Sequence, residues 1–166
     1  MEQVYSFPLK MHVGGPDVPV VKEGQKVKRG ECIAEPKGLG AKIHTSVSGK
    51  IVKITDAEII IEPGDKQSEE YVKIKKCSSI AETAFEAGIV GAGGAGFPTH
   101  IKLKTKLADG YIIANCVECE PVLHHNMSRI ERRPGEIIKG IRYAMSSTGA
   151  KKAYIAIKSK HLNAIK

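Results

Sequence analysis

Apolar positions in the first third of the chain recur in short runs that turn residues separate. The β-prone runs lie at 18–21, 26–27, 32–34, 42–44, 50–54 and 58–61. Glycine or proline stands between most of them, which is typical of strands joined by tight turns. Strands this short and evenly spaced predict a small all-β sandwich or barrel over residues 1–63.

A finer pattern lies inside this region. Val21, Gly24, Val27 and Gly30 follow the order V-x-x-G-x-x-V-x-x-G, and a Ser-x-x-Gly segment follows at Ser46. The pair resembles the lipoyl/biotinyl-carrier fold, a barrel-sandwich hybrid. Lys37 stands near the place of the carriers' modified lysine, but its usual neighbours are missing. We therefore expect the fold to serve as a docking domain.

The pattern changes after residue 63. Residues 64–77 are mostly polar and predict a connector, with one β-prone run at 71–74. Ser78 or Ser79 is a suitable cap for a helix that begins near Ile80 and stops at Gly88. We expect the next folded region to span residues 78–166.

Helical and strand patterns alternate in this second region. A short basic helix is predicted at 99–107, a buried strand at 111–114, a helix at 134–145 and a second strand at 153–157. Strand, helix and strand in this order predict a parallel sheet with a crossover helix. The fold class is thus α+β in two parts: a barrel-sandwich hybrid, then a Rossmann-like α/β domain that we expect to be incomplete.

Composition narrows the classes of function. The formal net charge of +8 is uneven, because residues 1–63 carry 9 Lys/Arg and 8 Asp/Glu against 17 and 10 in residues 64–166. A basic half attracts nucleic acid, acidic partners or phosphate-bearing cofactors, or is only a solvated surface. Aromatic residues make up 5% of the chain, which argues against base stacking. No signal peptide or membrane span is recognisable, so we expect a cytoplasmic protein.

The glycine cluster at residues 91–96 is the first candidate site. Gly91, Gly93 and Gly96 match G-x-G-x-x-G, but a helix-like segment precedes them where the nicotinamide fingerprint needs a strand. An ordinary Rossmann motif is therefore rejected here. Bare backbone amides at this cluster suit a phosphate. A flavin loop and a tightly turned structural loop both stay open.

A second cluster of polar side chains follows the first predicted strand. It reads Asn115-Cys116-Val117-Glu118-Cys119-Glu120-Pro121, with His124 and His125 close behind. A lone C-x-x-C indicates a redox dithiol or half of a zinc site. No second such pair exists in the chain, so we predict no metal site.

Both clusters carry a family resemblance. GAGGAGFPTHIK resembles the FMN-binding loop of the respiratory complex I flavoprotein, and YIIANCVECEP resembles a later motif of that flavoprotein. The chain is still more similar to RnfC of the Rnf electron-transport complex and its relatives, which include cobalamin reductases and a proline-reductase-associated electron-transfer protein. These carry E-C-E-P and begin with FPLKMHVG-like and KGLGA-like stretches. The resemblance covers essentially the whole chain.

The resemblance implies roles for eight residues. Gly91, Gly93, Gly94 and Gly96 would line the FMN phosphate and ribityl chain, Lys102 would neutralise their charge, Asn115 would hydrogen-bond the isoalloxazine, and Glu118 and Glu120 would lie near flavin and nicotinamide. Some of these have simpler alternatives. Lys102 is one of three neighbouring lysines, and Asn115 stands where a strand ends. Cys119 matches the E-C-E-P cysteine, which leaves Cys116 incidental.

The resemblance also has limits. The complex I arginine is Ala92 here and its aspartate is Val117, so NADH binding of the complex I type is in doubt. The family's iron–sulfur region is missing, which makes the chain look like an N-terminal portion.

Three hypotheses about function follow. The first is FMN-dependent electron transfer from an NADH-like donor to 4Fe-4S clusters in the missing region or to a partner reductase, peripheral to a membrane complex. The second is a non-catalytic docking module. The third, which the scarce aromatics disfavour, is a nucleic-acid- or zinc-binding protein.

Overall fold

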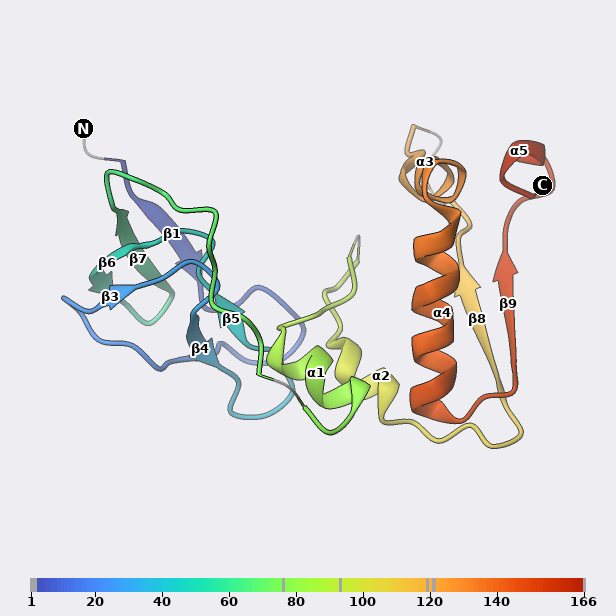
Figure 1. The fold of residues 1–166 in the computed structure, drawn as a ribbon, viewed down its shortest axis with the longest axis horizontal. Coiled ribbons are helices and arrows are strands. Elements are labelled where there is room, and N and C mark those ends of the chain that lie inside the picture. Colours follow the sequence, from blue (N-terminus) through green and yellow to red (C-terminus); the bar gives the residue numbers. More distant parts are fainter. Residues whose placement is uncertain (1–2, 76, 93, 119, 121, 166) are drawn as a thin grey trace. The chain divides into compact units, whose positions relative to one another are not determined.

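The computed structural model describes residues 3–75, 77–92, 94–118, 120 and 122–165. The chain divides into two compact units, one from Met1 to Lys102 and the other from Leu103 to Lys166. Each unit is described by itself (Figure 1). None of the described helices is long and apolar enough to cross a membrane.

The first unit is built around two antiparallel sheets. One sheet has the order β1 (Tyr5–Pro8), β7 (Glu58–Pro63), β6 (Gly49–Ile54) and β3 (Lys26–Val27). The other has the order β2 (Val18–Pro19), β4 (Cys32–Glu35) and β5 (Ile43–His44). This confirms the predicted short strands. The strand β1 was not predicted; it pairs with β7 from Tyr5 opposite Ile61 to Pro8 opposite Glu58.

One apolar core joins the two sheets. Ile51, Ile59 and Ile61 of the first sheet and Ile33 of the second are fully buried in it. In β7 these inward residues alternate with partly exposed ones, which is the period-2 pattern of a sheet with one face in the core. Among the described residues of this core, Phe7 is the single aromatic side chain, so aliphatic packing closes the barrel.

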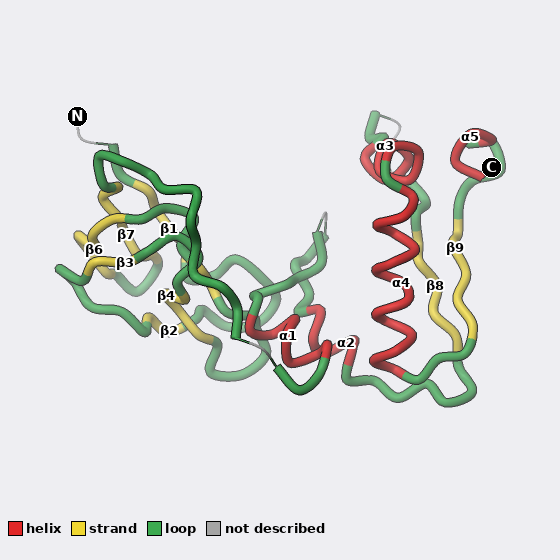
Figure 2. Tube along the Cα trace, viewed as in Figure 1, coloured by secondary structure: helices red, strands yellow, loops and turns green. Residues whose placement is uncertain are grey.

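Residues 64–77 lie against the barrel. The side chain of Gln67 exchanges hydrogen bonds with the backbone of Ser48, and the Val72 amide donates to the carbonyl of Arg29 at 2.8 Å. No strand forms at the described residues of 71–74 (Figure 2). The β-prone run was therefore misleading, because a single backbone bond at Val72 satisfies this segment without a ladder.

Two short helices complete the first unit. The helix α1 (Ile80–Glu86) begins as predicted, because the Ser79 hydroxyl oxygen accepts from the Glu82 amide at 3.1 Å. It ends before Gly88, whose φ of +64° favours glycine. A Cβ at Gly88 would also collide with the carbonyl of Lys42 in the barrel. The helix α2 (Thr99–Leu103) is shorter than the predicted 99–107.

The second unit contains a strand–helix–strand arrangement. The strands β8 (Tyr111–Asn115) and β9 (Lys152–Ala156) pair in parallel, from Tyr111 opposite Lys152 to Asn115 opposite Ala156. The helix α4 (Pro134–Thr148) connects them and packs beside both (Figure 1). The parallel pair and its crossover helix confirm the prediction, although two strands alone do not establish a Rossmann-like sheet.

The prediction of a buried strand at 111–114 was wrong in one respect. Tyr111 and Ile113 are 59% and 58% exposed, whereas Ile112 and Ala114 are partly buried on the α4 side. An uninterrupted apolar run does not tell whether one or both faces of a strand are covered. Two further helices, α3 (His125–Arg132) and α5 (Leu162–Ile165), were not predicted.

Candidate functional site

The glycine loop, residues 89–99, is a hairpin with a fixed base. Val90 and Pro98 form an antiparallel bridge, the Thr99 amide donates to the Ile89 carbonyl at 3.0 Å, and the Gly91 amide donates to the Phe97 carbonyl at 2.9 Å. These bonds close the base of the loop. Its tip is therefore presented by a rigid support.

The tip of the loop is open backbone. A Cβ built on Gly94 meets nothing within 4 Å, and Ala92, Gly94 and Ala95 are exposed. No hydrogen bond among the described residues uses the amides of these three. Unpaired amides beside bare glycine backbone are the donors that a phosphate group needs. Gly93 lies outside the described residues.

Lys102 lies next to this loop. Its Nζ is 5.6 Å from the centroid of the Phe97 ring, at the base of the hairpin. The amides and the ammonium group belong to the same compact unit. The loop and Lys102 thus fit an anionic phosphate ester, as the sequence predicted for FMN.

The other three predicted residues belong to the second unit. Asn115 ends β8, and its side-chain oxygen accepts from the Val117 amide at 3.1 Å. Glu120 is exposed. Their distance to the glycine loop is not defined, because the loop belongs to the first unit.

Glu118 has a structural task that the sequence did not reveal. It is only 6% exposed, and its Oε1 accepts from the backbone amides of Asn126 at 2.7 Å and Met127 at 3.3 Å. These are first-turn amides of α3, and His124 at the helix start makes no side-chain cap. The carboxylate therefore caps α3 from a distant part of the chain.

Lys158 is a further residue that the sequence reasoning missed. Its Nζ donates to the backbone carbonyl of Glu118 at 2.6 Å. A cleft of about 170 Å³ lies here, lined by Glu118, Glu120, Leu123, His124, Lys158, Lys160 and His161. Its residues follow the carboxyl ends of β8 and β9, where α/β proteins bind ligands. The Lys-Ser-Lys after the second predicted strand was the signal that pointed here.

The cysteine pair gives little support to metal or dithiol chemistry. Cys116 is buried among Met127 and Ile130, and burial, followed by the charge of Glu118, raises the pKa of its thiol. Cys119 lies outside the described residues. Within the described part of the chain, no three His, Cys, Asp or Glu side chains gather where they could hold a metal ion.

Comparisons with known proteins match both parts of the chain. Residues 1–78 match the RnfC barrel sandwich hybrid domain, and residues 84–166 match the Nuo51 FMN-binding domain. The chain belongs to the RnfC-like family. The match confirms the barrel-sandwich hybrid and the family predicted from the two motifs.

Several RnfC proteins are similar over nearly the whole chain. The C-type component of the Na(+)-translocating ferredoxin:NAD(+) oxidoreductase complex of Acetobacterium woodii is 31% identical over 96% of this chain and 40% of its own length. The corresponding component of the ion-translocating oxidoreductase complex of Rhodobacter capsulatus is 31% identical over 99% of this chain and 36% of its own. The chain thus spans about two fifths of these relatives.

A different branch of the family is similar over half of the chain. The cobalamin reductase PduS of Salmonella typhimurium is 41% identical over 52% of this chain and 19% of its own length. RnfC and cobalamin reductase thus share sequence with this chain while their names describe different activities.

Proposed function

We propose that this chain provides the FMN-binding part of an electron-transfer protein of the RnfC type. The observation that carries the proposal is the glycine loop, where exposed, unpaired amides and open space at Gly94 lie next to Lys102. The match of residues 84–166 to an FMN-binding domain family supports it independently.

In this proposal the loop amides of residues 91–96 hold the FMN phosphate, and Lys102 balances its charge. Asn115 and Glu120 meet the isoalloxazine and the donor, at the carboxyl end of β8. Glu118 keeps this end of the strand in place by fixing α3, with the hydrogen bonds described above. We take the second unit to be part of a larger Rossmann-like sheet.

FMN supplies the redox chemistry, because it accepts a hydride and releases single electrons. The protein binds and orients it. We propose an NADH-like donor, as the names of the Rnf relatives contain NAD(+), and 4Fe-4S clusters or a partner reductase as acceptors. The partners are the other proteins of the complex, and the place is the cytoplasmic face of the membrane. Residues 64–77 join the docking domain to the flavin domain.

The test is retention of FMN after incubation and desalting, read from the visible absorption spectrum. Gly94→Val is the decisive variant, because a side chain there meets nothing within 4 Å and leaves the fold intact. We expect it to weaken FMN binding by about tenfold or more, as one phosphate contact is lost. Gly38→Val, at an equally open glycine of the barrel, is the matched control and retains FMN.

A protein that retains no flavin, or a Gly94→Val variant that binds FMN as the natural protein does, contradicts the proposed loop. The donor is tested separately. The FMN-loaded protein is mixed with NADH under anaerobic conditions, and bleaching of the visible flavin band is followed. Binding of FMN without bleaching would leave the flavin site in place and reject NADH as the donor.

A further inference from the structure

Two ionisable side chains are buried in the barrel without a part in the proposed chemistry. His12 and Asp17 lie between β1 and β2, with side chains 3% and 0% exposed. A buried pair of this kind seldom stabilises a fold more than apolar residues of the same volume do. Its task is therefore to be sought in what the pair holds in place.

The His12 ring connects three segments of the barrel. Its Nε2 lies 2.9 Å from the Ala41 carbonyl and 3.3 Å from Oδ2 of Asp17, and its Nδ1 lies 3.1 Å from the Val13 carbonyl. The Ala41 amide is also within reach of Nε2, at 3.2 Å. The ring is thus fixed by Ala41 and Asp17 in either protonation state. Oδ1 of Asp17 is buried and has no hydrogen-bond partner among the described residues.

The backbone of the same histidine supports the glycine loop. A Cβ built on Gly96 would lie 3.1 Å from the Cα of His12 and 3.4 Å from the Met11 carbonyl oxygen. The Val13 amide also points to the Gly96 carbonyl, at 3.4 Å. Gly96 has a φ of +66°, so a larger residue would be strained as well as crowded. The end of the loop therefore rests on residues 11–13.

We propose that His12 and Asp17 are positioning residues for the glycine loop. The buried ring fixes the backbone of residues 11–13, and this backbone fixes Gly96 and with it the direction of the loop amides. The barrel domain is thereby a structural part of the anion site as well as a docking module. The inference rests on the proposed function in that the anion is the FMN phosphate.

The test compares His12→Ala with His12→Gln in two measurements. The first is amide hydrogen exchange of the FMN-free protein, in peptides that cover residues 94–98 and, separately, β6 and β7. The second is the FMN dissociation constant. Gln carries an amide group near the position of Nε2, so it retains part of the contacts to Ala41 and Asp17.

We expect His12→Ala to speed exchange in the loop and raise the FMN dissociation constant, each by about tenfold, the effect of about one hydrogen bond. His12→Gln should return most of both losses. Ile51→Val is the matched control, because it weakens the barrel core without touching the loop. It should leave the loop peptides and the FMN affinity as in the natural protein.

Loop exchange unchanged in both His12 variants would overturn the inference. So would faster exchange that spreads equally to β6 and β7, as Ile51→Val produces. Should His12→Ala fail to fold, His12→Gln alone decides through the ratio of loop to core exchange. If the natural protein binds no FMN, the proposed function fails, and the exchange measurement still decides whether His12 positions the loop.

Discussion

At the scale of single residues, Lys42 attaches α1 to the barrel. Its Nζ lies 2.9 Å from Oε1 of Glu35 and 2.9 Å from Oε2 of Glu86, and it lies over the ring of Phe85. Burial by itself lowers the pKa of Lys42, but the hydrogen bonds to the two carboxylates outweigh it and raise the pKa to about 12. The ammonium group is therefore stabilised by folding.

Lys42→Ala is expected to lower the free energy of unfolding by about 1–2 kcal/mol, less than for a fully buried pair because both carboxylates are partly exposed. The raised pKa makes this contribution complete below pH 10.5, and it is lost as the pH rises through about 12. Urea unfolding at pH 7 measures it, with the exposed Lys37→Ala as the control. Equal stability of the two variants would contradict the role of Lys42.

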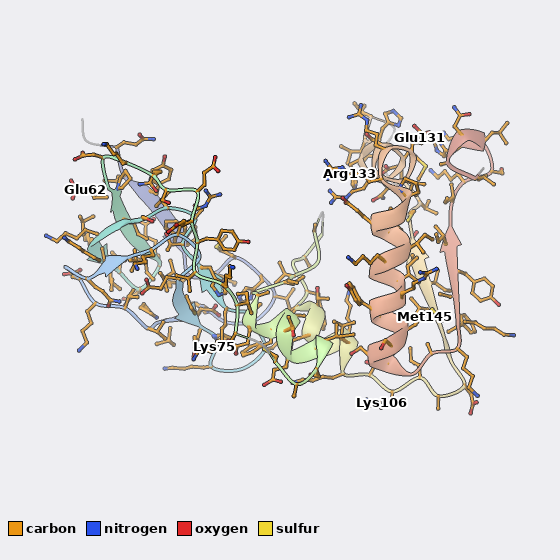
Figure 3. All side chains as sticks on the ribbon, viewed as in Figure 1. Glu62, Lys75, Lys106, Glu131, Arg133 and Met145 are labelled. Carbon is orange, nitrogen blue, oxygen red and sulfur yellow. The ribbon has the colours of Figure 1, made fainter. Side chains whose placement is uncertain are left out.

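At the scale of elements, the cap of α3 makes Glu118 a residue of folding. Glu118→Ala removes the acceptor of two first-turn amides, so we expect a loss of about 1–2 kcal/mol and faster amide exchange in α3. Glu131→Ala is the control, as Glu131 lies exposed near the end of α3, where Figure 3 shows its side chain. Unchanged exchange in α3 would assign Glu118 to the site alone.

The elements that the sequence predicted are those with local signals. Ser79 and Gly88 mark the ends of α1, and Pro134 and Gly149 mark those of α4. The missed elements lack them. The helix α3 begins at His125 without a capping side chain of its own, since its cap comes from Glu118. A capping group so far from the helix start is invisible to a local pattern.

At the scale of the whole molecule, the candidate site could be predicted only in part. The glycine loop was recognisable because its motif is contiguous, and the open backbone at Gly94 agrees with it. The support of Gly96 by His12 was not, because these residues are 84 positions apart and meet only in the folded unit. The tie between Lys42 and Glu86 is non-local in the same way. It places α1 with the barrel.

This grouping gives two competing boundaries that limited proteolysis separates. The sequence predicts the boundary in residues 64–77, whereas the compact units divide after Lys102. Lys104 and Lys106 are exposed and lie outside helix and strand. Lys75 is also exposed, but its segment is bonded to the barrel through Gln67 and Val72 (Figure 3).

We expect trypsin to cut first after Lys104 or Lys106, because cleavage needs several residues to become extended and this stretch lies in no regular element. Mass spectrometry at low protease concentration identifies the first fragments. The fragment that ends there should keep the barrel and α1 folded, with slow amide exchange in β6 and β7. A first cut between residues 66 and 76 would instead place the weak point in the connector and detach α1 and the glycine loop from the barrel.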